Sequence, residues 1–173
     1  MSKTIDYSKL TLKDALDLAI LIEDEAKERY EEFALQMETH HTTEAAGFYR
    51  FMAQNEAKHG HDLLERRQSL FGQAPSRIDR SMLWEVEAPE YEKAHAFMSP
   101  RAALEVALES EAKAWVFFDS VLKHVHDPEV RRLFEELRGE EDEHKELVRR
   151  EIAKLPPDSG LNDEDFVDEP VAQ

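Results

Sequence analysis

Two copies of one residue pattern, 85 or 86 positions apart, constrain the fold of this chain more than any other feature. Each copy is a lone Glu on one expected helix, followed by Glu-x-x-His on the next. The copies are Glu23, Glu56 and His59, and then Glu109, Glu141 and His144. One Glu from each of two helices, with Glu-x-x-His from each of two others, is a ligand set with which four-helix bundles hold two metal ions. The pattern therefore predicts a bundle in which six side chains converge.

Four stretches of helical periodicity separate these residues along the chain. Thr11 begins a capping-box sequence, whereas Ser99-Pro100 and Asp127-Pro128 each combine an N-cap residue with proline at the first helical position. Apolar residues recur three or four positions apart within each stretch. The expected helices are 11–39, 43–71, 100–124 and 128–154.

The connection between the second and third helices is long, covering residues 72–99, whereas the other two connections are short turns. Two helix hairpins joined by one long crossover are typical of one class of four-helix bundle. We therefore expect an all-α domain over residues 1–155. The tail, 156–173, has six acidic and no basic residues, and we expect it to be disordered.

The composition excludes several functions. A formal net charge of −17 over 173 residues repels nucleic acid and anionic membranes and attracts cations. The absence of Cys excludes disulfides, zinc ribbons, iron–sulfur clusters and thiol catalysis. No apolar run is long enough to cross a bilayer, and the first ten residues lack the apolar core of a signal peptide. We therefore expect a cytoplasmic protein that binds neither nucleic acid nor membrane.

The spacing of the repeat predicts that its four Glu lie at one height in the bundle. The midpoint of the first Glu pair falls between Thr39 and His40, and that of the second pair falls at Val125, each beside an expected turn. Every Glu is then about 16 residues, or about 24 Å, from its turn. Residues equidistant from the turn of an antiparallel hairpin lie side by side, so the four carboxylates share one layer.

The same residues are expected to face the core. Glu23 lies three residues before Ala26 on an apolar stripe, and Glu109 falls between Val106 and Val116 on a less regular one. Four ionised carboxylates in one core layer would repel one another and lose their hydration. Two divalent ions would balance their charge of −4, and two neutral His would add nitrogen ligands.

Glu-x-x-His alone is a weak signal in an acidic helical chain. It also occurs at Glu38/His41 and Glu92/His95, which lie near a turn and in the crossover. A lone Glu on an apolar stripe is usually a boundary residue that extends to solvent. The joint match of six residues in type, height and face is the stronger observation, and we expect the remaining histidines at turns or on the surface.

Around these residues the chain resembles the rubrerythrin and bacterioferritin branch of the ferritin-like superfamily. The matching segments lie at residues 21–30, 55–59, 107–113 and 141–144. The resemblance implies that the two lone Glu are terminal ligands, that the Glu of each Glu-x-x-His bridges two iron ions, and that each His binds one ion. It also implies that Tyr30, seven residues after Glu23, hydrogen-bonds the carboxylate layer.

Three features depart from the standard rubrerythrin pattern. Rubrerythrins usually carry a rubredoxin-like Cys-x-x-Cys iron site, and this chain has no Cys. They have an extra Glu three residues after the third-helix ligand, where this chain has Ala112, and a second Tyr where this chain has Val116-Phe117. The departures favour a ferroxidase-type centre with one Tyr, and electrons would come from a separate donor protein or from substrate iron.

The sequence therefore predicts a di-iron oxidoreductase that oxidises Fe(II) and reduces H2O2 or O2. The alternative is a non-catalytic iron-binding or iron-trafficking module, since the same fold occurs fused to membrane iron exporters and this chain could come from a longer protein. Manganese could replace iron, because both accept carboxylate and imidazole ligands. The resemblance implies a homodimer or larger assembly, in which the crossover residues Leu83, Trp84, Tyr91 and Phe97 could pack on the bundle or on a second subunit.

Overall fold

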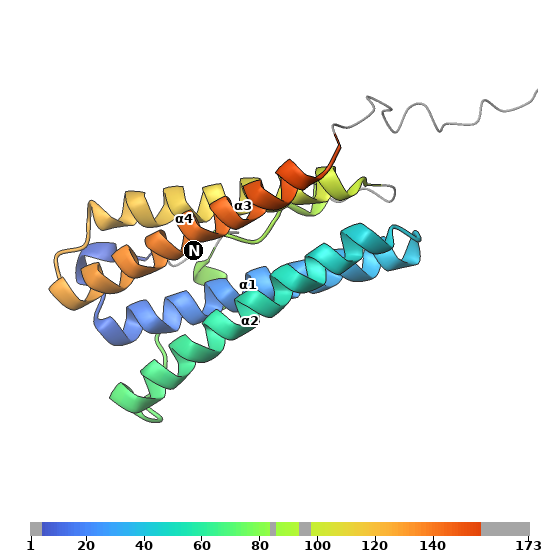
Figure 1. Cartoon of the computed structure of the whole chain (residues 1–173). Coiled ribbons are helices and arrows are strands. Elements are labelled where there is room, and N and C mark those ends of the chain that lie inside the picture. The colour runs from blue at the N-terminus through green and yellow to red at the C-terminus, as the bar shows by residue number, and fades with distance from the viewer. Residues whose placement is uncertain (1–4, 84–85, 94–97, 157–173) are drawn as a thin grey trace, which may run out of the picture.

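Four long helices make up most of the protein. The computed structural model describes residues 5–83, 86–93 and 98–156. The long helices are α1 (Leu12–Thr39), α2 (Thr43–Phe71), α3 (Pro100–Leu122) and α4 (Pro128–Lys154) (Figure 1). Three short 3-10 helices cover Tyr7–Lys9, Arg80–Met82 and Tyr91–Lys93. Within the described ranges the chain forms no strand, and none of these helices is long and apolar enough to cross a membrane.

Local sequence explains where the helices begin. Thr11 closes a capping box with Asp14 before α1, and the Ser99 hydroxyl accepts a hydrogen bond from the Ala102 backbone N–H at 3.0 Å before α3. Asp127 accepts from two backbone N–H groups in the first turn of α4. Because these signals are local, the helix bounds differ from the ranges expected from sequence by no more than two residues.

The helices form two antiparallel hairpins, α1 with α2 and α3 with α4. Figure 1 shows that the turns of the two hairpins lie at opposite ends of the bundle. The crossover therefore runs along the bundle from the end of α2 to the start of α3. This connectivity confirms the expected all-α four-helix bundle with one long crossover.

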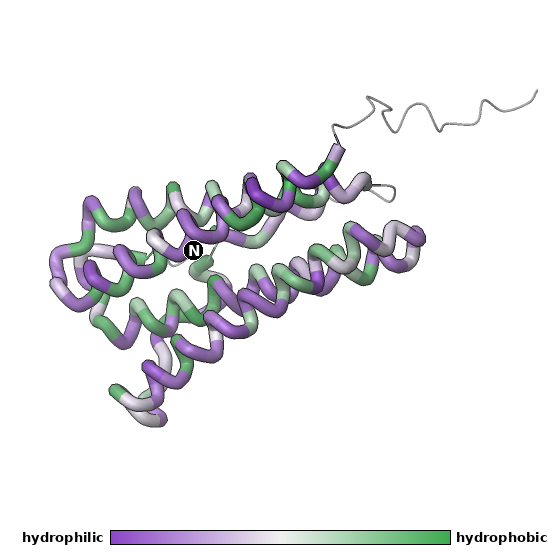
Figure 2. Tube along the Cα trace, viewed as in Figure 1, coloured by the Kyte–Doolittle hydropathy of each residue, from purple (hydrophilic) through white to green (hydrophobic). Residues whose placement is uncertain are grey.

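The apolar core fills the bundle in two parts. One part includes Leu16 and Phe118, and the other includes Phe33, Tyr49 and Val148. Figure 2 shows apolar and polar residues interleaved along each helix, as amphipathic packing requires. Every helix contributes to both parts, and the gap between them falls at one level. A polar layer occupies this gap.

The start of the crossover is anchored to α2 and α1 by Arg67. Its guanidinium donates to the Asp17 carboxylate at 2.8 Å, to the Gly72 carbonyl at 2.6 Å and to the Ala74 carbonyl. Although burial alone raises the pKa of Asp17, its hydrogen bonds with Arg67 and Lys13 hold that pKa below its usual value. Arg67 therefore fixes the path of the chain as it leaves α2.

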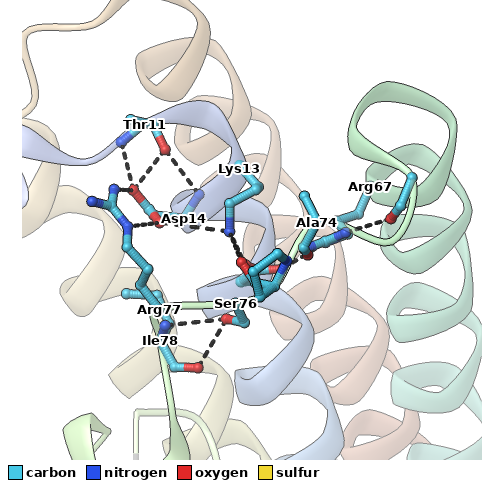
Figure 3. A network of polar contacts seen from close by, with 11 residues as sticks. Thr11, Lys13, Asp14, Arg67, Ala74, Ser76, Arg77 and Ile78 are labelled. Atoms are coloured by element: carbon cyan, nitrogen blue, oxygen red, sulfur yellow. Dashed lines mark hydrogen bonds and ion pairs between the residues drawn. The ribbon is translucent and has the colours of Figure 1, made fainter.

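A second set of contacts fastens the same segment to the first turn of α1 (Figure 3). Lys13 donates to the Pro75 carbonyl at 2.9 Å, and Arg77 donates to the Asp14 carboxylate at 2.6 Å. Further along, Leu83 packs against the core, whereas Tyr91 is exposed. The expectations for Trp84, Phe97 and the tail from residue 157 lie outside the described residues.

Candidate metal centre

A buried layer of acidic and histidine side chains crosses the bundle between the two parts of the core. Its members are Glu23 of α1, Glu56 and His59 of α2, Glu87 of the crossover, Glu111 of α3, and Glu141 and His144 of α4. No Glu in this layer is more than 3% exposed, and His59, with its side chain 20% exposed, is the most accessible member. Five of the six side chains that the sequence predicts to converge lie in this layer.

The first hairpin supplies one half of the layer. The His59 Nδ1 atom lies 4.0 Å from a carboxylate oxygen of Glu23 and 4.0 Å from one of Glu56. α1 and α2 approach closely here, because a Cβ added at Gly60 would lie 3.4 Å from the Glu23 Cβ. The lone Glu of α1 therefore lies beside the Glu-x-x-His pair of α2.

The second hairpin supplies the other half in a similar arrangement. The His144 Nδ1 atom lies 2.9 Å from a Glu111 oxygen and 3.8 Å from a Glu141 oxygen. The His59 and His144 rings stack with centroids 4.8 Å apart and planes 6° apart. Two atoms that each lie about 2.1 Å from one ion are about 3 Å apart at a right angle and about 4 Å apart when nearly opposite. The donor spacings in both halves fall in this range.

The prediction that Glu109 joins this layer is wrong. The Glu109 side chain is 64% exposed and pairs with Lys93 at 3.0 Å, on the outer surface of α3. Glu111 takes its place, two residues further on and fully buried. Two residues rotate a helix by about 200°, so these neighbouring carboxylates face opposite ways. The lone-Glu position of the second copy is therefore Glu111.

With Glu111 as the lone Glu of α3, the two α3 positions at which the chain differs from the standard rubrerythrin pattern also shift. Three residues after Glu111 stands Ala114 instead of Ala112, and the position still carries no carboxylate. Seven residues after Glu111, at the spacing that separates Tyr30 from Glu23, stands Phe118, which is buried. The layer therefore has one Tyr, in agreement with the sequence expectation.

Tyr30 contacts the layer from α1. Its hydroxyl donates to the Glu111 carboxylate at 3.0 Å, and its ring stacks on that of Tyr49 at 6.0 Å between centroids. Burial and the nearby carboxylates raise the pKa of Tyr30 well above its usual value, so the phenol stays protonated. Tyr30 is thus a fixed hydrogen-bond donor to Glu111.

Glu87 was missed by the sequence reasoning. It lies in the crossover, outside any helix, and is 1% exposed. Its carboxylate lies with those of Glu23 and Glu56 in a group whose ligand atoms are all within 4.8 Å of one another. No helical periodicity applies to this segment, so its sequence carries no signal for an inward-facing residue.

The electrostatics of the layer call for positive charge. Burial raises the pKa values of four carboxyl groups well above the usual value, and repulsion between the carboxylates raises these pKa values further. The four groups are those of Glu23, Glu56, Glu87 and Glu141. Six carboxylate oxygens of these residues are buried without a hydrogen-bond partner in the described part of the chain. Metal ions ligated by these oxygens would satisfy both requirements, so the donor set fits divalent ions.

The two histidines differ in their preference for protons. Burial lowers the pKa of His59, and repulsion by His144 lowers it further. Burial acts the same way on His144, but the hydrogen bond with Glu111 outweighs it and raises the pKa. A neutral His59 has a free lone pair for an ion, whereas His144 shares a proton with Glu111 that an ion would displace.

A cavity of about 140 Å³ lies between α2 and α4 and is lined by His59. Asp62, Glu136 and Glu140 also line it, together with leucine side chains and Arg66, which pairs with Glu136 at 2.8 Å. Burial raises the pKa of Glu140. Three acidic side chains against one basic one make the lining acidic overall, and the cavity adjoins the most accessible member of the layer.

Of the other Glu-x-x-His pairs, the three residues that the structure describes, Glu38, His41 and Glu92, lie outside the layer. Glu38 forms a two-hydrogen-bond ion pair with Arg50, and His41 lies in the α1–α2 turn with a φ of 62°. Glu92 is exposed in the crossover. His95 lies outside the described residues. The expectation that these pairs lie near the turn and in the crossover agrees with these positions.

A four-helix bundle with one long crossover and a buried carboxylate–histidine layer defines a ferritin-like protein. The model of the rubrerythrin family matches residues 14–152, and the chain belongs to the rubrerythrin family. It is similar to the crystal structure of an uncharacterized conserved protein from Magnetospirillum magnetotacticum MS-1. That match has 33% identity and a TM-score of 0.65, and covers 87% of this chain and 99% of that chain. No protein of curated function matches the chain.

Proposed function

We propose that the protein is a di-iron oxidoreductase that oxidises Fe(II) and reduces H2O2 or O2 within the buried layer. The observation that supports this most is the set of six buried carboxylate oxygens without partners, next to two stacked His. Two iron ions bound there would supply the electrons that reduce the oxidant. The family membership supports iron as the metal.

The residues of the chain would set the conditions for that chemistry. One ion would be held by His59, Glu23 and Glu56. The other ion would be held by His144, Glu111 and Glu141. Anionic carboxylates at low exposure stabilise higher positive charge and so favour the loss of electrons from the ions. Burial of the layer limits the access of water to the reaction.

Anaerobic loading tests this proposal. The chain is loaded with two equivalents of Fe(II) and then given O2 or H2O2, while ferric absorption in the near ultraviolet and oxidant consumption are followed. We expect both signals in the unmodified chain and neither in the Glu56→Ala/Glu141→Ala variant. Glu109→Gln, which alters an exposed carboxylate, is the matched control. Iron binding without oxidant consumption would exclude the oxidoreductase.

A second candidate is a module that binds iron and passes it on without turnover. The acidic cavity at His59 favours it, because such a cavity attracts cations to the layer and also releases them. A chemical reductant distinguishes the two functions. The oxidoreductase consumes many equivalents of oxidant per chain, whereas the binding module takes up and releases a fixed number of ions.

The identity of the metal and the partners form part of the same proposal. Manganese suits the same donor set, so metal analysis of the purified chain decides between the two ions. A chain without Cys needs electrons from a separate donor protein or from Fe(II) itself. We expect a homodimer or larger assembly, which sedimentation velocity would measure.

A further inference from the structure

Glu87 brings a fifth carboxylate into a layer to which the helices already contribute four. It comes from the strap, defined here as residues 86–93 of the crossover. Residues 86–89 of the strap are buried, and Glu90 beyond them is exposed. Both Glu87 carboxylate oxygens are buried without a hydrogen-bond partner in the described residues. A carboxylate on a connecting loop would reach solvent at little cost, so its burial here requires a cause.

The strap is held in place by one basic side chain from each hairpin. Lys113 of α3 donates to the Ala88 carbonyl at 2.7 Å, and Arg29 of α1 donates to the Pro89 carbonyl. The Arg29 guanidinium also lies over the Tyr91 ring, 3.3 Å from its centroid. Both bases bind backbone carbonyls beside Glu87 and leave its carboxylate directed into the layer.

The position of Glu87 makes the two halves of the layer unequal. Its oxygens group with those of Glu23 and Glu56, and with no ligand atom of the second hairpin in the groups that the described residues form. His144 belongs to two groups, one with Glu111 and Glu141 and one with Glu56 and His59. Counted by the hairpin that carries them, with Glu87 added to the first, the two halves hold three carboxylates and one His against two carboxylates and one His. An additional anionic oxygen raises the affinity of a site for a hard divalent ion.

We infer that Glu87 is a metal ligand of the half formed by Glu23, Glu56 and His59, and that this half binds its ion more tightly than the other. The inference rests on the proposed metal-binding function and deepens it. It has a structural consequence, because an ion held by Glu87 joins the strap to the bundle. Metal binding then stabilises residues 86–89 against local opening.

Binding of Mn(II) alone to the full chain tests this, by calorimetric titration and electron paramagnetic resonance. We expect two ions per chain in two resolved steps. Glu87→Gln keeps the size of the side chain and removes the charge, and should weaken the tighter step about 10- to 100-fold. The weaker step should change less than about threefold. Glu90→Gln, on the exposed part of the strap, is the matched control and should bind as the unmodified chain does.

Glu87→Asp separates ligation from charge alone. It keeps the negative charge but withdraws the carboxylate by one methylene, so a ligand role predicts weakened binding close to that of Glu87→Gln. Hydrogen exchange gives an independent readout. The amides of 86–88 should exchange more slowly on Mn(II) binding in the unmodified chain and not in Glu87→Gln. Circular dichroism checks that each variant folds.

The outcomes distinguish this inference from the proposed function. An unmodified chain that binds no Mn(II) or Fe(II) would overturn both. Two ions bound equally well by the unmodified chain and by Glu87→Gln would overturn the role of Glu87 and leave the proposed function standing. Retention of the tighter step in Glu87→Asp with loss in Glu87→Gln would reduce Glu87 to a source of charge, and would also overturn ligation.

Discussion

The Tyr30 hydroxyl of α1 donates a hydrogen bond to the Glu111 carboxylate of α3 at 3.0 Å, across the interface between the two hairpins. The other Glu111 oxygen contacts the His144 Nδ1 atom at 2.9 Å. Glu111 is thus held at both oxygens, whereas Glu56 and Glu87 have no hydrogen-bond partner in the described part of the chain at either oxygen. The lone Glu of α3 is therefore the most preorganised carboxylate in the layer.

Tyr30→Phe should weaken metal binding by about 10- to 100-fold, because loss of a hydrogen bond that orients a ligand typically has this effect. Competition against a chromophoric chelator under anaerobic conditions measures the affinity for Fe(II) or Mn(II). Tyr49→Phe is the matched control, since its equally buried hydroxyl lies 3.7 Å from the Met98 sulfur and bonds to no carboxylate among the described residues. Equal metal affinities in the Tyr30→Phe and Tyr49→Phe variants would show that Tyr30 does not orient a ligand.

Glu111→Gln should lower metal binding to one ion per chain, whereas Glu109→Gln should retain two. The reason is that Glu111 lies in the buried layer and Glu109 pairs with Lys93 at the surface. Metal content after gel filtration in the presence of Mn(II) measures the difference. If Glu109→Gln were the variant that lost an ion, the ligand assigned to α3 would be wrong.

The contrast between Glu109 and Glu111 shows how much of the buried layer could be predicted from the sequence. Both residues lie at nearly the same height, since moving from Glu109 to Glu111 shifts the midpoint of the Glu pair by one residue, about 1.5 Å along the axis. Only the helix face separates them. Glu111 lies on a regular stripe with the buried residues Leu104, Ala107, Ala114, Phe118 and Val121.

The prediction of Glu109 relied on a second, less regular apolar stripe of α3 that runs through Val116. That stripe does not face the core, since Val116 is 60% exposed. The segment Glu-x-Glu-Ala-Lys also occurs in both α1 and α3, and α1 turns its first Glu inward where α3 turns its second. Helix positions and bundle topology followed from local caps and spacing. The inward position of Glu87 could not be predicted from local caps and spacing, because tertiary contacts made by Arg29 and Lys113 determine where the strap lies.

The metal-free protein should lose stability as the pH rises. The pKa values of Glu23, Glu56, Glu87 and Glu141 lie above 4.5 in the folded state. Their contribution is therefore fully present below about pH 4.5 and is lost as pH rises through the folded values. His144, with a raised pKa, adds to the loss, whereas His59, with a lowered one, opposes it.

Thermal unfolding in the presence of a chelator measures this effect. We expect the Tm to fall by at least about 4 °C between about pH 5 and 8, since 1 kcal/mol corresponds to about 2–4 °C in a domain of this size. Mn(II) should add about 2.7 kcal/mol for each site that it fills at 100 times its Kd. At one fixed Mn(II) concentration the gain should be larger at higher pH, because the carboxyl groups then bind the ion without losing protons. Glu56→Gln should flatten the slope in the chelator. A Tm that rises over this range would contradict the proposed electrostatics.

Arg67→Ala should destabilise the fold by about 1.5–3 kcal/mol, because it removes a charged hydrogen bond to the buried Asp17 carboxylate, which keeps its ion pair with Lys13. Urea unfolding followed by circular dichroism measures the change. Arg66→Ala is the matched control. Its ion pair with Glu136 is largely exposed, so the expected cost is about 0–1 kcal/mol. Similar costs for the two variants would show that the Arg67 network contributes no more than a surface pair.

Asp62→Asn combined with Glu140→Gln should slow metal uptake about tenfold and leave the equilibrium affinity nearly unchanged. Both side chains line the cavity that ends at His59, and negative charge along a route raises the local concentration of cations and their association rate. Stopped-flow transfer of Fe(II) from a weak chromophoric chelator measures the rate, and added salt should reduce the difference. Glu146→Gln, an exposed carboxylate on the same helix paired with Arg150, should leave the rate unchanged. Equal rates in all three proteins would mean that ions reach the layer by another route, and a large loss of affinity in the double variant would make these residues part of the site.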